Sequence, residues 1–133
     1  MAVKKTTSAR YKDISFAFGI HPVKKDISKL TDEDAVKRSV VNLVLTKHFE
    51  RPFHPEIGCD VTKMLFENIS PITALNIQRS IEDVINNFEP RVRLQEVAVQ
   101  ADPDNNGYVA SIYFYVVNVP NLVTVDMFLE RIR

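Results

Sequence analysis

The sequence predicts an α+β fold in which two main helices and one short helix pack on a small antiparallel sheet of three or four strands. Apolar residues recur at helical spacing over residues 32–47 and 71–88. They alternate with polar residues over residues 108–116, directly after the turn sequence Asp104-Asn105-Asn106-Gly107. Helices followed by strands, without an internal repeat or linker, indicate one domain whose helices cover one face of the sheet.

The composition limits the classes of function. The 133 residues include 17 Lys or Arg and 17 Asp or Glu, so the formal net charge is zero. Without excess positive charge we expect no nucleic-acid partner, and no apolar run is long enough to span a membrane. Cys59 is the only cysteine, which excludes an intrachain disulfide and suits a soluble protein made in a cytosol.

The first dozen residues are basic and contain Lys4, Lys5, Arg10 and Lys12. This pattern predicts a flexible, solvated arm at residues 1–13, followed by a single domain at residues 14–133. Over residues 14–20 large apolar residues alternate with small ones as far as His21-Pro22. We expect a short strand or an extended arm there.

The first helix is predicted over residues 32–47. Thr31 is a suitable N-cap, and the acidic first turn favours the helix dipole. The residues expected to face the core are Val36, Val40, Leu43 and Val44. Residues 48–59 lose this periodicity and contain two prolines and a glycine, so they are predicted to form a structured loop.

Two further helices are expected. Asp60 is suited to cap a short helix that continues through Glu67. Ser70-Pro71 places a capping serine before a proline at the first helical position, so the longer helix begins there and ends at Phe88. Its predicted buried stripe comprises Ile77, Ile81, Val84, Ile85 and Phe88.

The strands follow the longer helix. Val97 and Val99 mark the first strand, but Val92 and Leu94 fall in the opposite phase, so a bulge or a late start is expected near Gln95. The return strand after the turn has an alternating face of Tyr108, Ala110, Ile112, Phe114 and Val116.

The last segment fits two periodicities. Residues 123–129 alternate as in a strand, whereas a helical face would comprise Val125, Phe128, Leu129 and Ile132. The β-branched residues at positions 123–125 favour a strand. In that strand Phe128 lies on the face opposite to Val125 and Leu129.

The candidates for metal binding are incomplete. His48, His54 and Cys59 are of zinc-binding types, but a structural zinc site usually takes four ligands. Residues 102–107 match the first half of a calcium loop, yet Tyr113 stands where the bidentate glutamate is required. We therefore expect no metal and no cofactor.

Paired carboxylates offer the one route to catalysis that the sequence suggests. Glu50 and Glu56 flank a proline-rich loop, Glu89 lies near a helix end, and glycoside cleavage uses two carboxyl groups. A catalytic acid also needs an apolar cleft that raises its pKa, and the sequence contains no tryptophan for stacking on sugars. We predict that the protein is not an enzyme.

The tripeptide Glu89-Pro90-Arg91 joins the longer helix to the first strand. Proline cannot continue a helix and restricts the residue before it, so the geometry of this corner is fixed. A carboxylate near a helix C-terminus opposes the macrodipole, so helix energetics do not favour Glu89 there. We expect both charges to project towards a partner and Arg91→Ala to spare folding. A solvated surface ion pair is the alternative.

Several motifs together resemble a known family. They are residues 51–58 (Arg-Pro-Phe-His-Pro-Glu-Ile-Gly), residues 64–67 (Met-Leu-Phe-Glu), residues 87–91 (Asn-Phe-Glu-Pro-Arg) and residues 129–131 (Leu-Glu-Arg). In this order the chain resembles the baseplate wedge protein, or sheath initiator, of contractile-tailed bacteriophages. That family has relatives in type VI secretion baseplates and has long been labelled lysozyme-like. The resemblance covers most of the chain, from about Asp32 onward.

The resemblance implies a structural protein of the virion tail baseplate, assembled in the host cytoplasm in several copies. It implies that Glu89, Pro90 and Arg91 dock on the helical core bundle of the wedge, and that the sheet initiates the tail sheath. An open sheet edge can accept a strand from another chain. We expect sheath strand addition at the last segment, through Val123, Val125, Met127, Phe128 and Leu129. A lysozyme-like enzyme and a generic protein-binding module are the alternatives.

Overall fold

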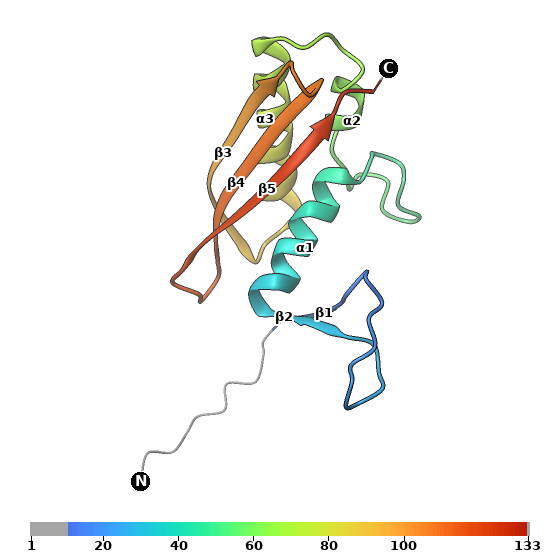
Figure 1. Ribbon diagram of the computed structural model, residues 1–133. Coiled ribbons are helices and arrows are strands. Elements are labelled where there is room, and N and C mark those ends of the chain that lie inside the picture. The colour runs from blue at the N-terminus through green and yellow to red at the C-terminus, as the bar shows by residue number, and fades with distance from the viewer. Residues whose placement is uncertain (1–10, 133) are drawn as a thin grey trace.

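The computed structural model describes residues 11–132, so the predicted arm at residues 1–13 lies mostly outside the described residues. The elements are β1 (Lys12–Ile14), β2 (Lys29–Thr31), α1 (Asp32–Leu45), α2 (Val61–Met64), α3 (Pro71–Phe88), β3 (Val92–Asp102), β4 (Gly107–Val116) and β5 (Leu122–Glu130). Figure 1 shows β1 and β2 as a small hairpin below α1, away from the main sheet. In the described part, no helix is long and apolar enough to cross a membrane.

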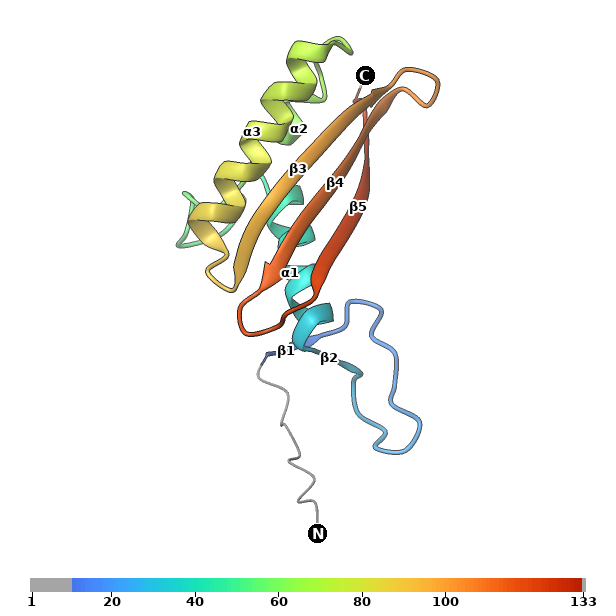
Figure 2. The same ribbon diagram turned by 90° about the vertical axis from the view of Figure 1, so that its left-hand side faces the viewer.

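The main sheet is antiparallel, with the strand order β3-β4-β5. The helices α1 and α3 lie on the same face of this sheet (Figure 2), and α3 packs mainly against β3. The predicted face of β4 is buried throughout, at Tyr108, Ala110, Ile112, Phe114 and Val116. The α+β fold with helices on one face is therefore confirmed.

The long helix α3 begins where the sequence indicates. The Ser70 hydroxyl accepts a hydrogen bond from the Thr73 amide at 3.1 Å, and Pro71 occupies the first turn. The predicted stripe of Ile77, Ile81, Val84 and Ile85 is buried, and Phe88 packs on its edge. Local capping and helical periodicity thus determine this helix.

The shorter helices differ in detail from the expectation. The helix α1 ends at Leu45 rather than Lys47, and the Thr31 side chain makes no capping hydrogen bond. The helix α2 ends at Met64 rather than Glu67. Asp60 is the N-cap residue of α2, as predicted, but its side chain makes no capping hydrogen bond and pairs with Lys63 Nζ at 2.9 Å.

The predicted bulge in β3 is present. Pairing with β4 shifts register between Leu94 and Glu96, so Gln95 is the extra residue and the strand already begins at Val92. The following turn is the predicted hairpin turn, in which Asn106 has a φ of 54°. Asparagine tolerates this left-handed conformation better than most residues.

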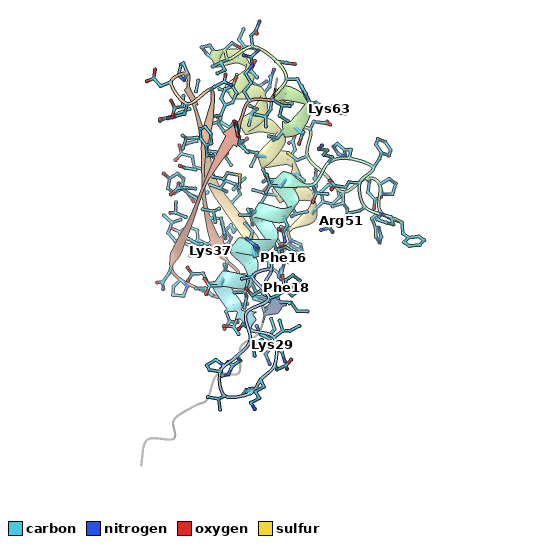
Figure 3. The ribbon with its side chains drawn as sticks, turned by 45° about the vertical axis from the view of Figure 1, so that its right-hand side comes forward. Phe16, Phe18, Lys29, Lys37, Arg51 and Lys63 are labelled. Carbon is cyan, nitrogen blue, oxygen red and sulfur yellow. The ribbon has the colours of Figure 1, made fainter. Side chains whose placement is uncertain are left out.

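The expected short strand or extended arm over residues 14–20 is wrong beyond Ile14. The chain turns after β1, with the Phe18 amide donating to the Ser15 carbonyl at 3.0 Å, and returns through β2. The alternating apolar residues of this segment remain exposed, because no part of the sheet covers them. Phe16 and Phe18 instead lie near α1 (Figure 3).

The last segment is a strand, which resolves its two periodicities. The strand β5 pairs with β4 without a register shift. Its inner positions Val123, Val125 and Leu129 are buried, whereas Met127 is half-buried. Phe128 is on the opposite face and 49% exposed.

Candidate partner-binding sites

The corner at the end of α3 contains a closed ion pair. Glu89 Oε1 accepts from Arg91 Nε at 2.6 Å, and Oε2 accepts from Arg91 Nη2 at 2.8 Å. The Ser39 hydroxyl of α1 donates to the same Oε2 at 2.5 Å. Such a bidentate, charge-assisted pair is strong and directional.

Burial distinguishes the two charges of this pair. The Glu89 side chain is 3% exposed, whereas that of Arg91 is 32% exposed. Burial raises the pKa of Glu89, but the hydrogen bonds from Arg91 and Ser39 outweigh this effect and lower it overall. Glu89 therefore does not project from the surface as expected, because its carboxylate completes a pair inside the fold.

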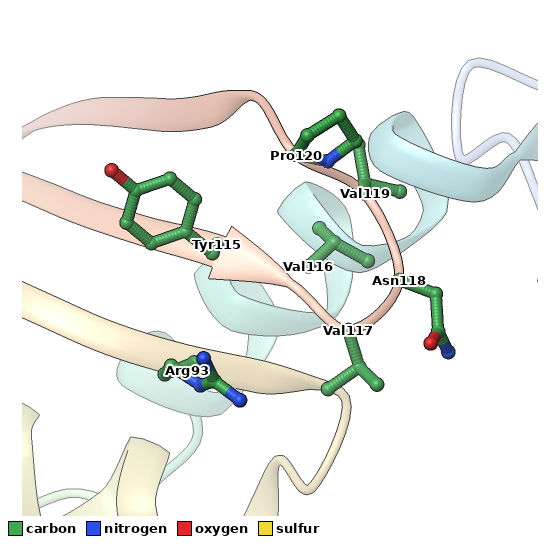
Figure 4. A pocket seen from close by; sticks show the side chains of 7 residues that line it. All are labelled: Arg93, Tyr115, Val116, Val117, Asn118, Val119 and Pro120. Carbon is green, nitrogen blue, oxygen red and sulfur yellow. The ribbon is translucent and has the colours of Figure 1, made fainter.

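The surface around Arg91 remains accessible. The Arg91 guanidinium lies 5.5 Å from the ring centre of Tyr11, which is a cation–π distance. The backbone carbonyl of Arg91 accepts a hydrogen bond from the Val117 amide at 2.9 Å, so the corner adjoins the β4–β5 turn. Figure 4 shows the hollow at this turn, lined by Arg93, Tyr115 and residues 116–120.

The second candidate site is the outer edge of β5. Among residues 11–132, β5 pairs only with β4. The Arg131 amide donates to the Asn106 carbonyl at 2.9 Å, which fixes the hydrogen-bonding phase of the two strands. In an antiparallel pair, every second residue of a strand points its backbone N–H and C=O groups towards the same neighbouring strand. The backbone groups of Val123, Val125, Met127 and Leu129 consequently face β4.

The backbone groups that face away from β4 are those of the intervening residues. They belong to Thr124, Asp126 and Phe128, of which the expected site included only Phe128. The other expected positions support this edge from within the core. Side-chain alternation indicated the two faces of the strand, but it could not indicate which backbone groups are free.

A groove runs beside the start of this edge. Its walls come from the N-terminal hairpin, α1 and β5, and its lining includes Ala17, Leu30, Val41, Thr124 and Asp126. Two cations of α1, Lys37 and Arg38, also line it. The helical pattern places Lys37 and Arg38 away from the core face, and it does not mark Arg38 as a binding residue.

Two of the three candidate metal ligands, His48 and Cys59, line the same hollow. Among the described residues, no group of three or more His, Cys, Asp or Glu side chains is placed to share a metal ion. His48 faces Asp60 at 3.6 Å, and His54 faces Glu56 at 3.1 Å. Cys59 is buried against Ser80, and burial raises the pKa of its thiol.

The two loop carboxylates lack the features of a catalytic acid. Glu50 accepts from the Lys47 amide at 2.8 Å. Glu56 is exposed, and its pKa is lowered by a backbone hydrogen bond and by His54.

The Asp102 carboxylate of the calcium-like sequence accepts two hydrogen bonds from Asn105, which are typical of a turn.

Comparison with known proteins identifies the family. The sequence profile of the family "Baseplate wedge protein gp25" matches residues 30–117. The chain belongs to the baseplate wedge protein gp25 family. The baseplate wedge protein gp25 of Enterobacteria phage T4 is 36% identical over 97 residues, which cover 73% of this chain and 74% of the relative.

Solved structures agree with this assignment. A chain of the anti-feeding prophage baseplate superposes with a TM-score of 0.70 at 28% identity, over 84% of this chain and 89% of that chain. A Geobacter sulfurreducens protein named as a tail lysozyme superposes with a TM-score of 0.64 over 76% of this chain and 95% of that chain. At 21% identity the second likeness shows the fold alone.

The predicted family and class of function are therefore confirmed. As a member of the gp25 family, the chain is a structural component of a contractile-tail baseplate and is located in the virion tail. The strand β5 lies beyond the residues matched by the family profile.

Proposed function

We propose that the chain initiates the tail sheath by accepting an extended segment of a sheath subunit alongside β5. The observation that supports this proposal most directly is the regular outer edge of β5, whose backbone groups at Thr124, Asp126 and Phe128 have no partner strand in the described part of the chain. An unpaired edge supplies donors and acceptors at the spacing of an added strand.

We propose further that the Glu89-Pro90-Arg91 corner docks on the helical core of the baseplate wedge. The closed pair supports a division of roles within the tripeptide. Glu89 is buried and fixes the guanidinium, and Arg91 offers its exposed surface next to Arg93 and the β4–β5 turn. A fixed planar guanidinium is well suited to bind carboxylates on a partner.

A peptidoglycan-hydrolysing activity is the rival function, and the carboxylates do not favour it. Glu56 is exposed and its pKa is lowered, whereas a general acid in glycoside cleavage needs a raised pKa. We therefore propose that the protein is not an enzyme. Purified protein should leave a peptidoglycan suspension turbid, and clearing that disappears in Glu56→Gln would overturn this conclusion.

A pair of proline substitutions tests the strand addition. Asp126→Pro removes an outward amide of β5, which an edge strand tolerates. Ala101→Pro is the matched control, because the hydrogen bonding between β3 and β4 leaves the Ala101 amide on the outer edge of β3. Both variants should remain folded, but only Asp126→Pro should prevent sheath polymerisation on assembled baseplates, as seen by electron microscopy. Normal polymerisation with Asp126→Pro would contradict strand addition at β5.

A further inference from the structure

Arg38 occupies an unusual position in the groove beside β5. It extends from α1, and Phe16 of the N-terminal segment covers its guanidinium at 4.9 Å from the ring centre. Figure 3 shows Phe16, from the N-terminal segment, beside the part of α1 that carries Lys37. The Arg38 Nε atom is inaccessible to solvent and has no hydrogen-bond partner among residues 11–132. A buried donor of this kind is unfavourable unless another molecule supplies an acceptor.

The other charges of the groove are already accommodated. Lys37 pairs with Glu33 at 3.0 Å. Asp34 is exposed in the first turn of α1, where the helix dipole favours an acid, and Asp126 is exposed on β5. Water can hydrate both carboxylates, whereas it cannot reach Arg38 Nε. Arg38 is therefore the group whose bonding an occupant of the groove would complete.

We infer that the segment added alongside β5 carries an acidic side chain that pairs with Arg38. This inference rests on the proposed strand addition and specifies the chemistry of the added segment. A strand next to β5 would lie about 4.8 Å from it, and alternate side chains would point towards α1. A carboxylate at one of these positions can accept from the guanidinium, and it reaches Nε once the incoming segment moves the Phe16 ring that covers the guanidinium.

The same geometry specifies the neighbouring positions of the segment. The groove lining next to Arg38 includes Ala17, Leu30 and Val41, which are small or apolar. Side chains two residues before or after the acid point to the same side of an added strand. We therefore expect apolar residues there, so that the segment reads apolar-x-acid-x-apolar.

Charge reversal tests this inference. Binding of purified sheath subunits to assembled baseplates is measured with wild-type protein, Arg38→Glu and Lys37→Glu. Lys37→Glu is the matched control, because it changes the charge of the same groove equally but leaves the buried donor in place. Arg38→Glu should weaken binding at least about tenfold and Lys37→Glu about threefold or less, since a close charge pair exceeds a screened surface charge.

Two further variants separate the possible outcomes. Replacing the responsible acid of the sheath segment by arginine should restore binding to Arg38→Glu. If Arg38→Glu has a lower melting temperature than the wild type, binding is measured with Arg38→Gln instead, because this variant removes the charge without reversing it. Undiminished binding with either Arg38 variant, while Asp126→Pro abolishes binding, would overturn the acidic contact but keep strand addition. Undiminished binding with Asp126→Pro would instead refute the proposed function.

Discussion

Two arginines of this protein lie on aromatic rings of the N-terminal segment, but their hydrogen bonding differs. Arg91 stacks near Tyr11 and makes two hydrogen bonds to Glu89. Arg38 stacks on Phe16, and its Nε has no acceptor in the described part of the molecule. The difference shows that the arginine in the family motif is also part of the fold. Arg38 lies outside the Glu89-Pro90-Arg91 motif, yet it is the arginine whose buried donor still lacks an acceptor.

Arg91→Ala should have the largest effect on stability. It leaves the buried Glu89 carboxylate without its cation, which typically costs about 3–5 kcal/mol in a fully buried pair. Because Arg91 is partly exposed, we expect a loss of about 2–4 kcal/mol in the free energy of unfolding, measured with urea. This revises the expectation that Arg91→Ala spares folding. An unchanged urea midpoint would show that the corner does not brace the fold.

The ion pair should also make stability depend on pH. The folded pKa of Glu89 is below its ordinary value of 4.5, so its contribution is present above that value and is lost as pH falls through the lowered pKa. Thermal melting of the wild type should therefore decline below about pH 4.5 more steeply than that of Glu89→Gln. Parallel pH profiles would contradict a charged, paired Glu89.

The two aromatic contacts should have smaller effects. Tyr11→Leu and Phe16→Leu each remove a cation–π contact while retaining an apolar side chain. Each substitution should reduce the free energy of unfolding by about 0.5–1 kcal/mol. A double-mutant cycle of Tyr11→Leu with Arg91→Lys measures the contact itself, and zero coupling would show that the ring only covers the corner.

Arg38→Ala should have the smallest effect on the isolated protein. Removing an unsatisfied donor offsets the loss of its packing on Phe16, so the free energy of unfolding should change by less than about 0.5 kcal/mol. Comparing the free energies of unfolding of Arg38→Ala and Arg91→Ala tests directly whether the two arginines differ in their contribution to the fold. A loss as large as that of Arg91→Ala would show that Arg38 has a structural role within the chain.

Local signals explain why much of the fold could be predicted. Ser70-Pro71 fixed the start of α3, and the phase change between Leu94 and Val97 indicated the bulge at Gln95. These features depend on neighbouring residues alone. The strand expected over residues 14–20 failed, because alternation indicates a strand only where a core is available to cover one face.

The sites were less predictable, because they depend on distant partners. Ser39 reaches Glu89 from a helix 50 positions earlier, and Phe16 covers Arg38 across a turn and a strand. The free backbone groups of β5 follow from the bond between Arg131 and Asn106, which no side-chain pattern reveals. The sequence could therefore indicate the corner and the edge strand, but not the closed pair or the outward residues.

The bulge at Gln95 has a consequence for stoichiometry. An extra residue in an edge strand bends it and interrupts the regular spacing of its free groups. The β3 edge is therefore regular only over residues 96–102, whereas the β5 edge is regular along its whole length. Under the proposed strand addition at β5, each copy holds one incoming segment. The number of segments in the first ring then equals the number of copies in the baseplate.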